Sequence, residues 1–153
     1  GCPALAGLYW RIWLEKLTFE NGSGQFAPAQ RLTDFLEEKE SKSLPVTSYK
    51  PGVVSSRLDK WLPKDICKKL QAGFKDFNKS MKGFVCPDAI LIASETRTST
   101  PVRILRNKDT LECTAIKNLY PCGEGSGYSG GIGSSAMDGE RVAGAIINSL
   151  KAQ

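Results

Sequence analysis

Apolar side chains recur every three or four residues in three long stretches of the chain, at 4–20, 63–81 and 130–151. This spacing places them on one face of an α-helix, so the sequence predicts three helices that each bury that face. Pro63 and Asp65 suit the start of the middle helix. The apolar positions are Leu5, Leu8, Tyr9, Ile12, Trp13 and Leu17; Ile66, Leu70, Phe74, Phe77 and Met81; and Ala136, Val142, Ala143, Ile146, Ile147 and Leu150.

Shorter segments carry the patterns of strands. The continuous apolar run 89–93 predicts a buried strand, and the alternating run 102–106 predicts another, with 111–114 as its hairpin partner. The apolar segment 116–122 predicts a strand that ends at a glycine. Residues 29–38 fit either a short helix or a strand. Together with the three helices, these segments predict a mixed fold.

The composition is that of a soluble globular protein, with 41% apolar and 24% charged residues in 153. The net charge of +5 is spread along the chain and forms no basic stripe, so nothing indicates a nucleic-acid-binding motif. The chain has no histidine, which excludes a Ser–His or Cys–His catalytic pair and leaves a metal to carboxylates and thiols.

The five cysteines are scattered and form no C-x-x-C pair. An odd number without close spacing argues against a disulfide framework and against a zinc site. Reduced thiols suit a cytosolic or organellar-matrix compartment. We therefore expect no bound metal.

The most informative feature is a glycine-rich segment between the strand predicted at 116–122 and the helix predicted at 130–151. Its glycines permit positive φ and a close approach of the backbone to a ligand. The helix that follows directs unpaired N–H groups and a positive dipole end toward that ligand. A flexible loop that caps a strand is the alternative, but the strand, Glu124 and the helix together favour a ligand site. The segment reads Gly123-Glu124-Gly125-Ser126-Gly127-Tyr128-Ser129-Gly130-Gly131-Ile132.

The letters G-x-G-x-x-G at 125–130 match the dinucleotide-binding fingerprint, but they stand near the carboxyl end of the chain. One helix follows them, which leaves no room for a β-α-β unit. They therefore indicate a returning strand and its closing helix.

Four phrases of the sequence resemble a group of FAD-dependent dehydrogenases, known as FAD/NAD(P)-binding oxidoreductases, from bacteria and plant plastids. The two specific phrases are 95–104, which reads Glu-Thr-Arg-Thr-Ser-Thr-Pro-Val-Arg-Ile, and 119–132, continued by Asp138-Gly139. The phrases at 27–36 and 49–52 are similar to the same group. Ser126 and Ser129 stand where that group commonly has alanine.

The resemblance implies an α/β fold: an α+β insert followed by the closing strand and helix of a glutathione-reductase-like FAD-binding domain. Residues 1–118 would be the helical and β insert on the substrate side, and 119–153 the strand, loop and helix of the flavin domain. That domain is incomplete here, since its ADP-binding half would lie in an amino-terminal segment outside the chain. The implied partners are FAD, that amino-terminal half and an unknown small-molecule substrate, with NAD(P) as a further cofactor.

The same resemblance assigns roles to individual residues. Glu124 would meet the ribityl chain of FAD, and the Gly131 and Ile132 N–H groups would lie near the pyrimidine end of the isoalloxazine. No catalytic residue is assigned. The implied cofactor-binding residues are Gly123, Glu124, Gly125, Gly127, Tyr128, Gly130, Gly131 and Ile132, and the implied substrate-side residues are Glu95, Arg97, Thr98 and Ser99.

Several alternatives stay open at this point. Arg97 could pair with Glu95 or Asp138 as a structural ion pair, and Tyr128 could be a packing residue. Cys122 suits a buried, inert thiol at a strand end. The alternative function is a non-catalytic module or subunit that binds a protein partner without flavin. The resemblance places the protein in the cytoplasm or the plastid stroma.

Overall fold

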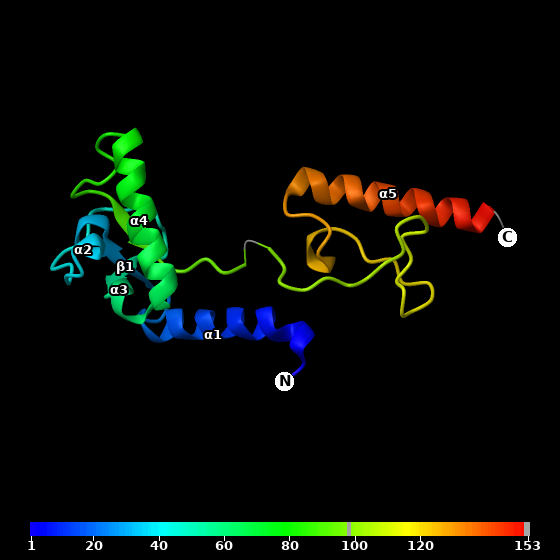
Figure 1. The fold of residues 1–153 in the computed structure, drawn as a ribbon, viewed down its shortest axis with the longest axis horizontal. Helices are drawn as coiled ribbons and strands as arrows, with labels where there is room; N and C mark the ends of the chain where they lie inside the picture. Colours follow the sequence, from blue (N-terminus) through cyan, green and yellow to red (C-terminus); the bar gives the residue numbers. More distant parts are fainter. Residues whose placement is uncertain (98, 152–153) are drawn as a thin grey trace. The chain divides into compact units, whose positions relative to one another are not determined.

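The computed structural model describes residues 1–97 and 99–151. These residues form a mixed α/β fold of helices and one small three-stranded sheet (Figure 1). They group into two compact units, one of residues 13–94 and one of residues 1–12 with 95–153. In chain order the elements are η1 (Pro3–Leu5), α1 (Ala6–Glu20), β1 (Ala27–Arg31), α2 (Leu32–Leu36), β2 (Val53–Ser55), α3 (Leu58–Trp61), α4 (Lys64–Ser80), β3 (Ile90–Ile92), η2 (Glu124–Ser126) and α5 (Ile132–Lys151), where η denotes a 3-10 helix.

The three long predicted helices are confirmed as α1, α4 and α5. The run 89–93 forms β3 as predicted, although its side chains are half-buried. Residues 29–38 contain both of the predicted alternatives, because β1 ends at Arg31 and α2 begins at the next residue. The predicted boundary between residues 118 and 119 concerns the return of the chain to a flavin domain, and it stays a prediction.

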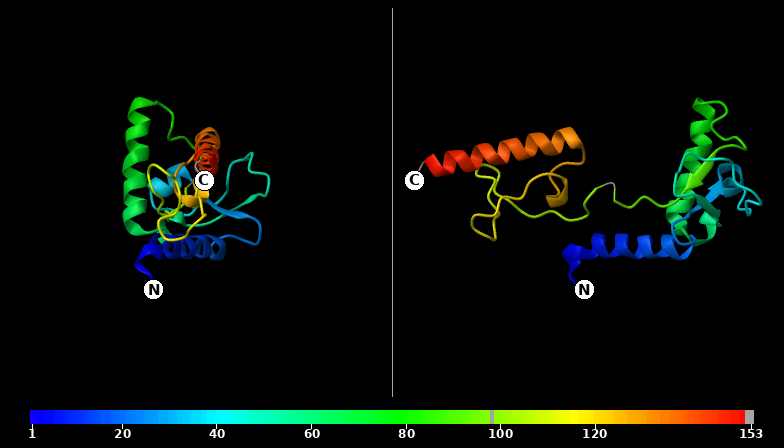
Figure 2. Two further views of the ribbon diagram at one scale, coloured as in Figure 1. Left: turned by 90° about the vertical axis from the view of Figure 1, so that its right-hand side faces the viewer. Right: turned by 180° about the vertical axis from the view of Figure 1, so that it is seen from behind.

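The unit of residues 13–94 is built on the sheet, whose strand order is β2-β1-β3. The central strand β1 pairs in parallel with β2 and antiparallel with β3. Helix α4 extends from this sheet region in the views of Figures 1 and 2. Its Phe74 ring meets Phe35 of α2 edge-on, with ring centroids 6.3 Å apart. The buried core of the unit consists of Leu14, Phe35, Leu58, Leu62 and Cys67.

A buried polar side chain fastens the central strand to its surroundings. Gln30 of β1 is fully buried. Its Nε2 donates to the Lys39 carbonyl and to Asp59 Oδ1, both at 2.7 Å, and its Oε1 accepts from the Asp59 N–H. Burial raises the pKa of Asp59, but hydrogen bonds from Arg57 and Gln30 outweigh it and hold that pKa below its ordinary value. Gln30 therefore joins β1, the 37–41 loop and α3.

Replacing Gln30 with alanine is expected to destabilise the sheet by about 2 kcal/mol, because it removes the partner of the Asp59 N–H and of the Lys39 carbonyl and leaves a gap at a fully buried position. Hydrogen exchange of the β1 amides should become about 30-fold faster. The control is Gln25→Ala at an exposed position, where exchange should stay unchanged. Equal rates in both variants would contradict this role for Gln30.

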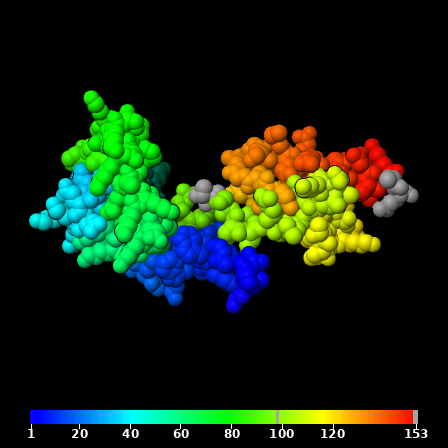
Figure 3. All heavy atoms as spheres, in the orientation of Figure 1, coloured from blue at the N-terminus to red at the C-terminus, as the bar shows by residue number. Residues whose placement is uncertain are grey.

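The strands predicted at 102–106, 111–114 and 116–122 are wrong. An isolated bridge between Arg106 and Cys113 replaces the predicted hairpin. Strands need neighbours to satisfy their backbone groups. These segments belong to the unit of residues 1–12 with 95–153, whose described part contains no named strand to pair with them. Residues 105–120 instead form loops without a named helix or strand. These loops lie beside α5 (Figure 3).

The predicted buried faces of α1, α4 and α5 are largely wrong as well. In α4 the buried residue is Cys67, whereas Leu70, Phe77 and Met81 of the predicted face are exposed. Leu14 is the buried residue of α1, whereas Trp13, in the predicted stripe, is 48% exposed. In α5 Val142 is buried, but Ala136, Ala143, Ile147 and Leu150 are exposed and Ile146 is half-buried. Helical spacing predicts which residues share a face, but a face is buried only where the fold supplies surface to cover it. Trp10 is also about half exposed, whereas Trp61 packs against the core.

None of the helices in the described ranges combines the length and apolar character that crossing a bilayer requires.

Candidate functional site

The glycine-rich segment forms a tight turn before α5. Gly123 and Gly127 flank η2 with φ of 69° and 87°, a backbone region that favours glycine. A Cβ on Gly127 would lie 2.6 Å from the Val102 carbonyl oxygen. Gly125 and Gly130 have neither a positive φ nor an atom within 4 Å of such a Cβ. The fold therefore explains glycine at 123 and 127, and it leaves open space at 125 and 130.

One carboxylate fixes the start of this turn. Asp138 of α5 receives two hydrogen bonds from Arg106, at 2.6 and 3.0 Å, and one from the Gly123 N–H at 2.9 Å. Arg106 also donates to the Pro121 carbonyl at 2.7 Å. The Arg106 and Asp138 side chains are 6% and 12% exposed. This bidentate pair joins the loop at 106, the glycine segment and α5.

The pKa values of this pair move in the directions that pairing requires. The hydrogen bond from Arg106 holds the pKa of Asp138 below its ordinary value, against the opposing effect of burial. The Gly123 N–H lowers it further. The pKa of Arg106 is raised by the same bond. Both groups therefore stay charged at neutral pH.

Tyr128 packs against this pair. Its ring lies under the Arg106 guanidinium, 3.6 Å from the guanidinium carbon to the ring centroid. Its hydroxyl donates to the Ile104 carbonyl and accepts the Arg106 N–H. Of the two alternatives, these contacts support the packing role. A direct contact between Tyr128 and flavin stays a prediction.

Sequence reasoning missed Arg106 entirely and assigned Asp138 to a possible pair with Arg97. Asp138 pairs with Arg106 instead. The two residues are 32 positions apart, so no local pattern links them.

The other predicted cofactor-binding residues lie at the turn and at the start of α5. Glu124 begins η2 and is half-buried. Within the described residues its carboxylate makes no hydrogen bond or salt bridge. The Gly131 N–H donates to Ser134 Oγ at 3.2 Å, and the Ile132 side chain is 96% exposed. The turn thus presents one carboxylate that the fold itself does not use.

Of the predicted substrate-side residues, the three that the structure describes, Glu95, Arg97 and Ser99, belong to no helix or strand. Glu95, Arg97 and Ser99 are exposed, and the Ser99 carbonyl accepts from Arg11 at 3.2 Å. Thr98 lies outside the described residues. Their role on the substrate side stays a prediction.

The five cysteines are free thiols, and Cys122 is exposed. The expectation of a buried Cys122 is therefore wrong. Cys122 was expected at the end of a strand at 116–122, and that strand does not form. Among the described residues no group of three or more cysteines and carboxylates is arranged to hold a metal ion.

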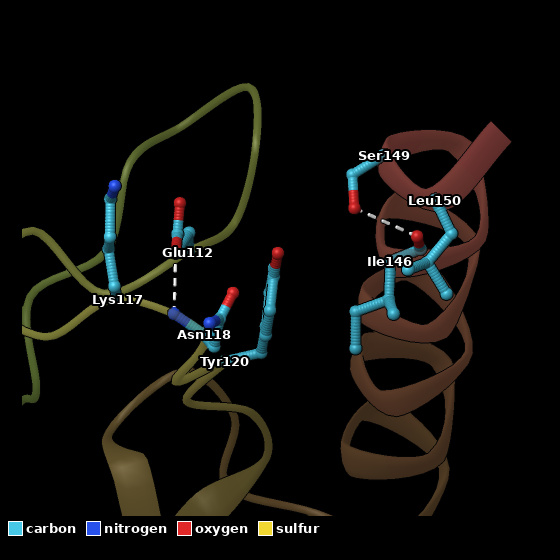
Figure 4. Close-up of a pocket in the computed structure, with 7 residues that line it drawn as sticks. All are labelled: Glu112, Lys117, Asn118, Tyr120, Ile146, Ser149 and Leu150. Atoms are coloured by element: carbon cyan, nitrogen blue, oxygen red, sulfur yellow. Dashed lines mark hydrogen bonds between the residues drawn. The ribbon is translucent and has the colours of Figure 1, made fainter. Parts of the chain in front are cut away.

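A cleft of about 630 Å³ separates the 112–120 loop from the C-terminal half of α5 (Figure 4). The loop wall is polar, with the Asn118 N–H donating to Glu112 Oε1 at 2.7 Å. The helix wall carries Ile146 and Leu150. Oppositely charged groups and apolar carbon line the same space, so its chemistry does not select one class of ligand.

Comparison with known proteins gives the class. Residues 2–98 match the sequence model of the family described as FAD-dependent protein, C-terminal domain-like. The chain belongs to this family. It is also similar to an uncharacterised protein of Clostridium beijerinckii (strain ATCC 51743 / NCIMB 8052), with 41% identity over 150 residues. That alignment covers 96% of this chain and 28% of the relative, so the chain spans less than a third of the relative's length.

Proposed function

We propose that this chain supplies the ribityl and isoalloxazine side of a flavin site in an FAD-dependent oxidoreductase. The observation that carries the proposal is the Glu124 carboxylate, which has no hydrogen bond within the described residues and stands in a turn that Asp138 holds in place. Membership in an FAD-dependent family supports the same cofactor. The amino-terminal half of the full-length protein would bind the ADP part.

The residues present fit one side of such a site. Glu124 can accept hydrogen bonds from ribityl hydroxyls, and the backbone at Gly125 and Gly130 has open space for a close approach. The first N–H groups of α5 and its positive dipole end favour an electron-rich carbonyl or a phosphate. Bound FAD would supply hydride transfer, while these residues position it and set its electrostatic surroundings.

The substrate-side role proposed for Glu95, Arg97, Thr98 and Ser99 rests on the resemblance. A nicotinamide dinucleotide is the proposed electron donor or acceptor. The role of the nicotinamide dinucleotide is tested separately by adding NADH or NADPH to the bound flavin. Reduction of the flavin is measured as the loss of its visible absorbance. An unchanged spectrum with both would remove NAD(P) from the proposal.

The full-length protein is expected to purify with oxidised flavin, and Glu124→Gln should weaken flavin binding about 10-fold. A hydrogen bond to a charged acceptor contributes about 1.5–3 kcal/mol, and the amide cannot replace the charge. The measurement is fluorescence titration of the apoprotein with FAD. Glu140→Gln, at an exposed position of α5, is the matched control.

A full-length protein that is colourless and does not bind added FAD would overturn the proposal. It would favour the alternative of a module that binds a protein partner without flavin. Equal affinities of the Glu124 and Glu140 variants would remove Glu124 from the site but leave the flavin.

A further inference from the structure

A second, smaller cleft includes one residue of the glycine-rich segment in its lining. Its volume is about 320 Å³, and it is lined by Arg106, Asn107, Lys108, Leu111, Tyr128 and Arg141. Tyr128 of the glycine-rich segment is one of these lining residues. Three of the six lining residues are cations, and no carboxylate is among them in the part of the chain that the structure describes.

The three cations are not equivalent. Arg106 is 6% exposed, and its charge is balanced by Asp138. Lys108 and Arg141 are exposed, and within residues 1–97 and 99–151 neither side chain makes a hydrogen bond or a salt bridge. Arg141 contributes to the lowered pKa of Asp138, which places its charge close to the same pair. The cleft therefore carries two cations, Lys108 and Arg141, whose donors are not used by a hydrogen bond or a salt bridge within the described residues.

The polar groups of the cleft are arranged as donors. The Asn107 side-chain oxygen already accepts the N–H groups of Asp109 and Thr110, at 2.8 and 3.0 Å. Because both acceptor sites of that oxygen are used, Asn107 has its amide NH₂ left to offer the cleft. Lysine and arginine carry donors and no acceptors. A cationic ligand would find no carboxylate in the lining of this cleft to balance its charge.

We propose that this cleft binds the oxyanion of a small molecule, a phosphate or a carboxylate, with Lys108 and Arg141 as its charged donors. Arg106 and Tyr128 form the fixed wall, because the Asp138 pair and the Ile104 carbonyl hold them. A cleft of this volume admits a small anion but not a dinucleotide. The site goes beyond the proposed flavin site, because Lys108 and Arg141 are not among the predicted cofactor-binding residues, and its occupancy does not require flavin.

The test uses the full-length protein with inorganic phosphate and succinate as probes, measured by isothermal titration calorimetry at low ionic strength. At least one probe is expected to bind saturably. The double variant Lys108→Gln, Arg141→Gln should weaken that binding about 10-fold or more, since charge-assisted hydrogen bonds contribute about 1.5–3 kcal/mol each. The control is Lys151→Gln, which removes one charge from α5, the helix that carries Arg141, at a position outside the cleft. This variant should leave binding unchanged.

Both substituted side chains are exposed, so the double variant should melt at the wild-type temperature. Absence of saturable binding of either probe to the wild type would overturn the proposal, as would equal binding by the double variant. The flavin absorbance of the double variant distinguishes the source of the anion. Retention of flavin supports a free small molecule, whereas loss of flavin would show that the oxyanion is the pyrophosphate of FAD and would overturn the proposal.

Discussion

Asp138→Asn is expected to release the glycine-rich turn, at a cost of about 3 kcal/mol in local stability. The substitution keeps the shape of the side chain but leaves the Arg106 guanidinium without its counter-charge at 6% exposure. Removing one partner of a buried pair is costly because the other charge stays desolvated. In the full-length protein, hydrogen exchange of amides in 104–128 should become about 100-fold faster. Flavin binding should fall with it.

Asp109→Asn is the matched control, because Asp109 is exposed on the adjacent loop. Its exchange rates should stay at the wild-type values. Unchanged protection in the Asp138 variant would show that the glycine-rich turn does not depend on this pair.

The same pair predicts a pH dependence. Because the folded pKa of Asp138 lies below its ordinary value of 3.8, the pair contributes fully to stability above that pH. The contribution is lost as the pH falls through the lower, folded pKa. The difference in melting temperature between wild type and Asp138→Asn should therefore be constant near neutral pH and shrink below about pH 4. A constant difference down to about pH 2 would contradict the assignment.

The sequence predicted those parts of the fold whose information is local. Helical spacing found α1, α4 and α5, and a short apolar run found β3. It failed where a structure depends on partners distant in the chain. The run 102–106 alternates as a strand does, but it lies against Ser126 and Gly127 instead of another strand, through the Ile104 N–H and Arg103 Nε.

The candidate site divides in the same way. Glycines and Glu124 at 123–131 were recognisable because they are contiguous. The Arg106–Asp138 pair that holds them was not, because its two halves lie on separate elements and neither has a distinctive neighbourhood in the sequence. The apolar faces of α1, α4 and α5 show a related limit: amphipathic spacing describes a helix, whereas burial depends on what the rest of the fold brings against it.

Gly127→Ala is expected to disrupt the turn by about 3 kcal/mol or more. A residue with a Cβ is strained at φ 87°, and the added carbon would lie 2.6 Å from the Val102 carbonyl oxygen and 3.0 Å from Arg103 Cα. Both contacts are to backbone, which cannot turn away as a long side chain can. Hydrogen exchange of amides in 123–128 should accelerate about 100-fold, and flavin content should fall with it.

Gly125→Ala is the informative comparison, because no atom lies within 4 Å of its added carbon and its φ is not positive. Protection of 123–128 should therefore stay at the wild-type level. If the Gly125 backbone approaches flavin closely, as proposed, this variant should nevertheless bind FAD more weakly. Wild-type FAD affinity in Gly125→Ala would remove that glycine from the site, and wild-type protection in Gly127→Ala would contradict the packing of the turn against 102–103.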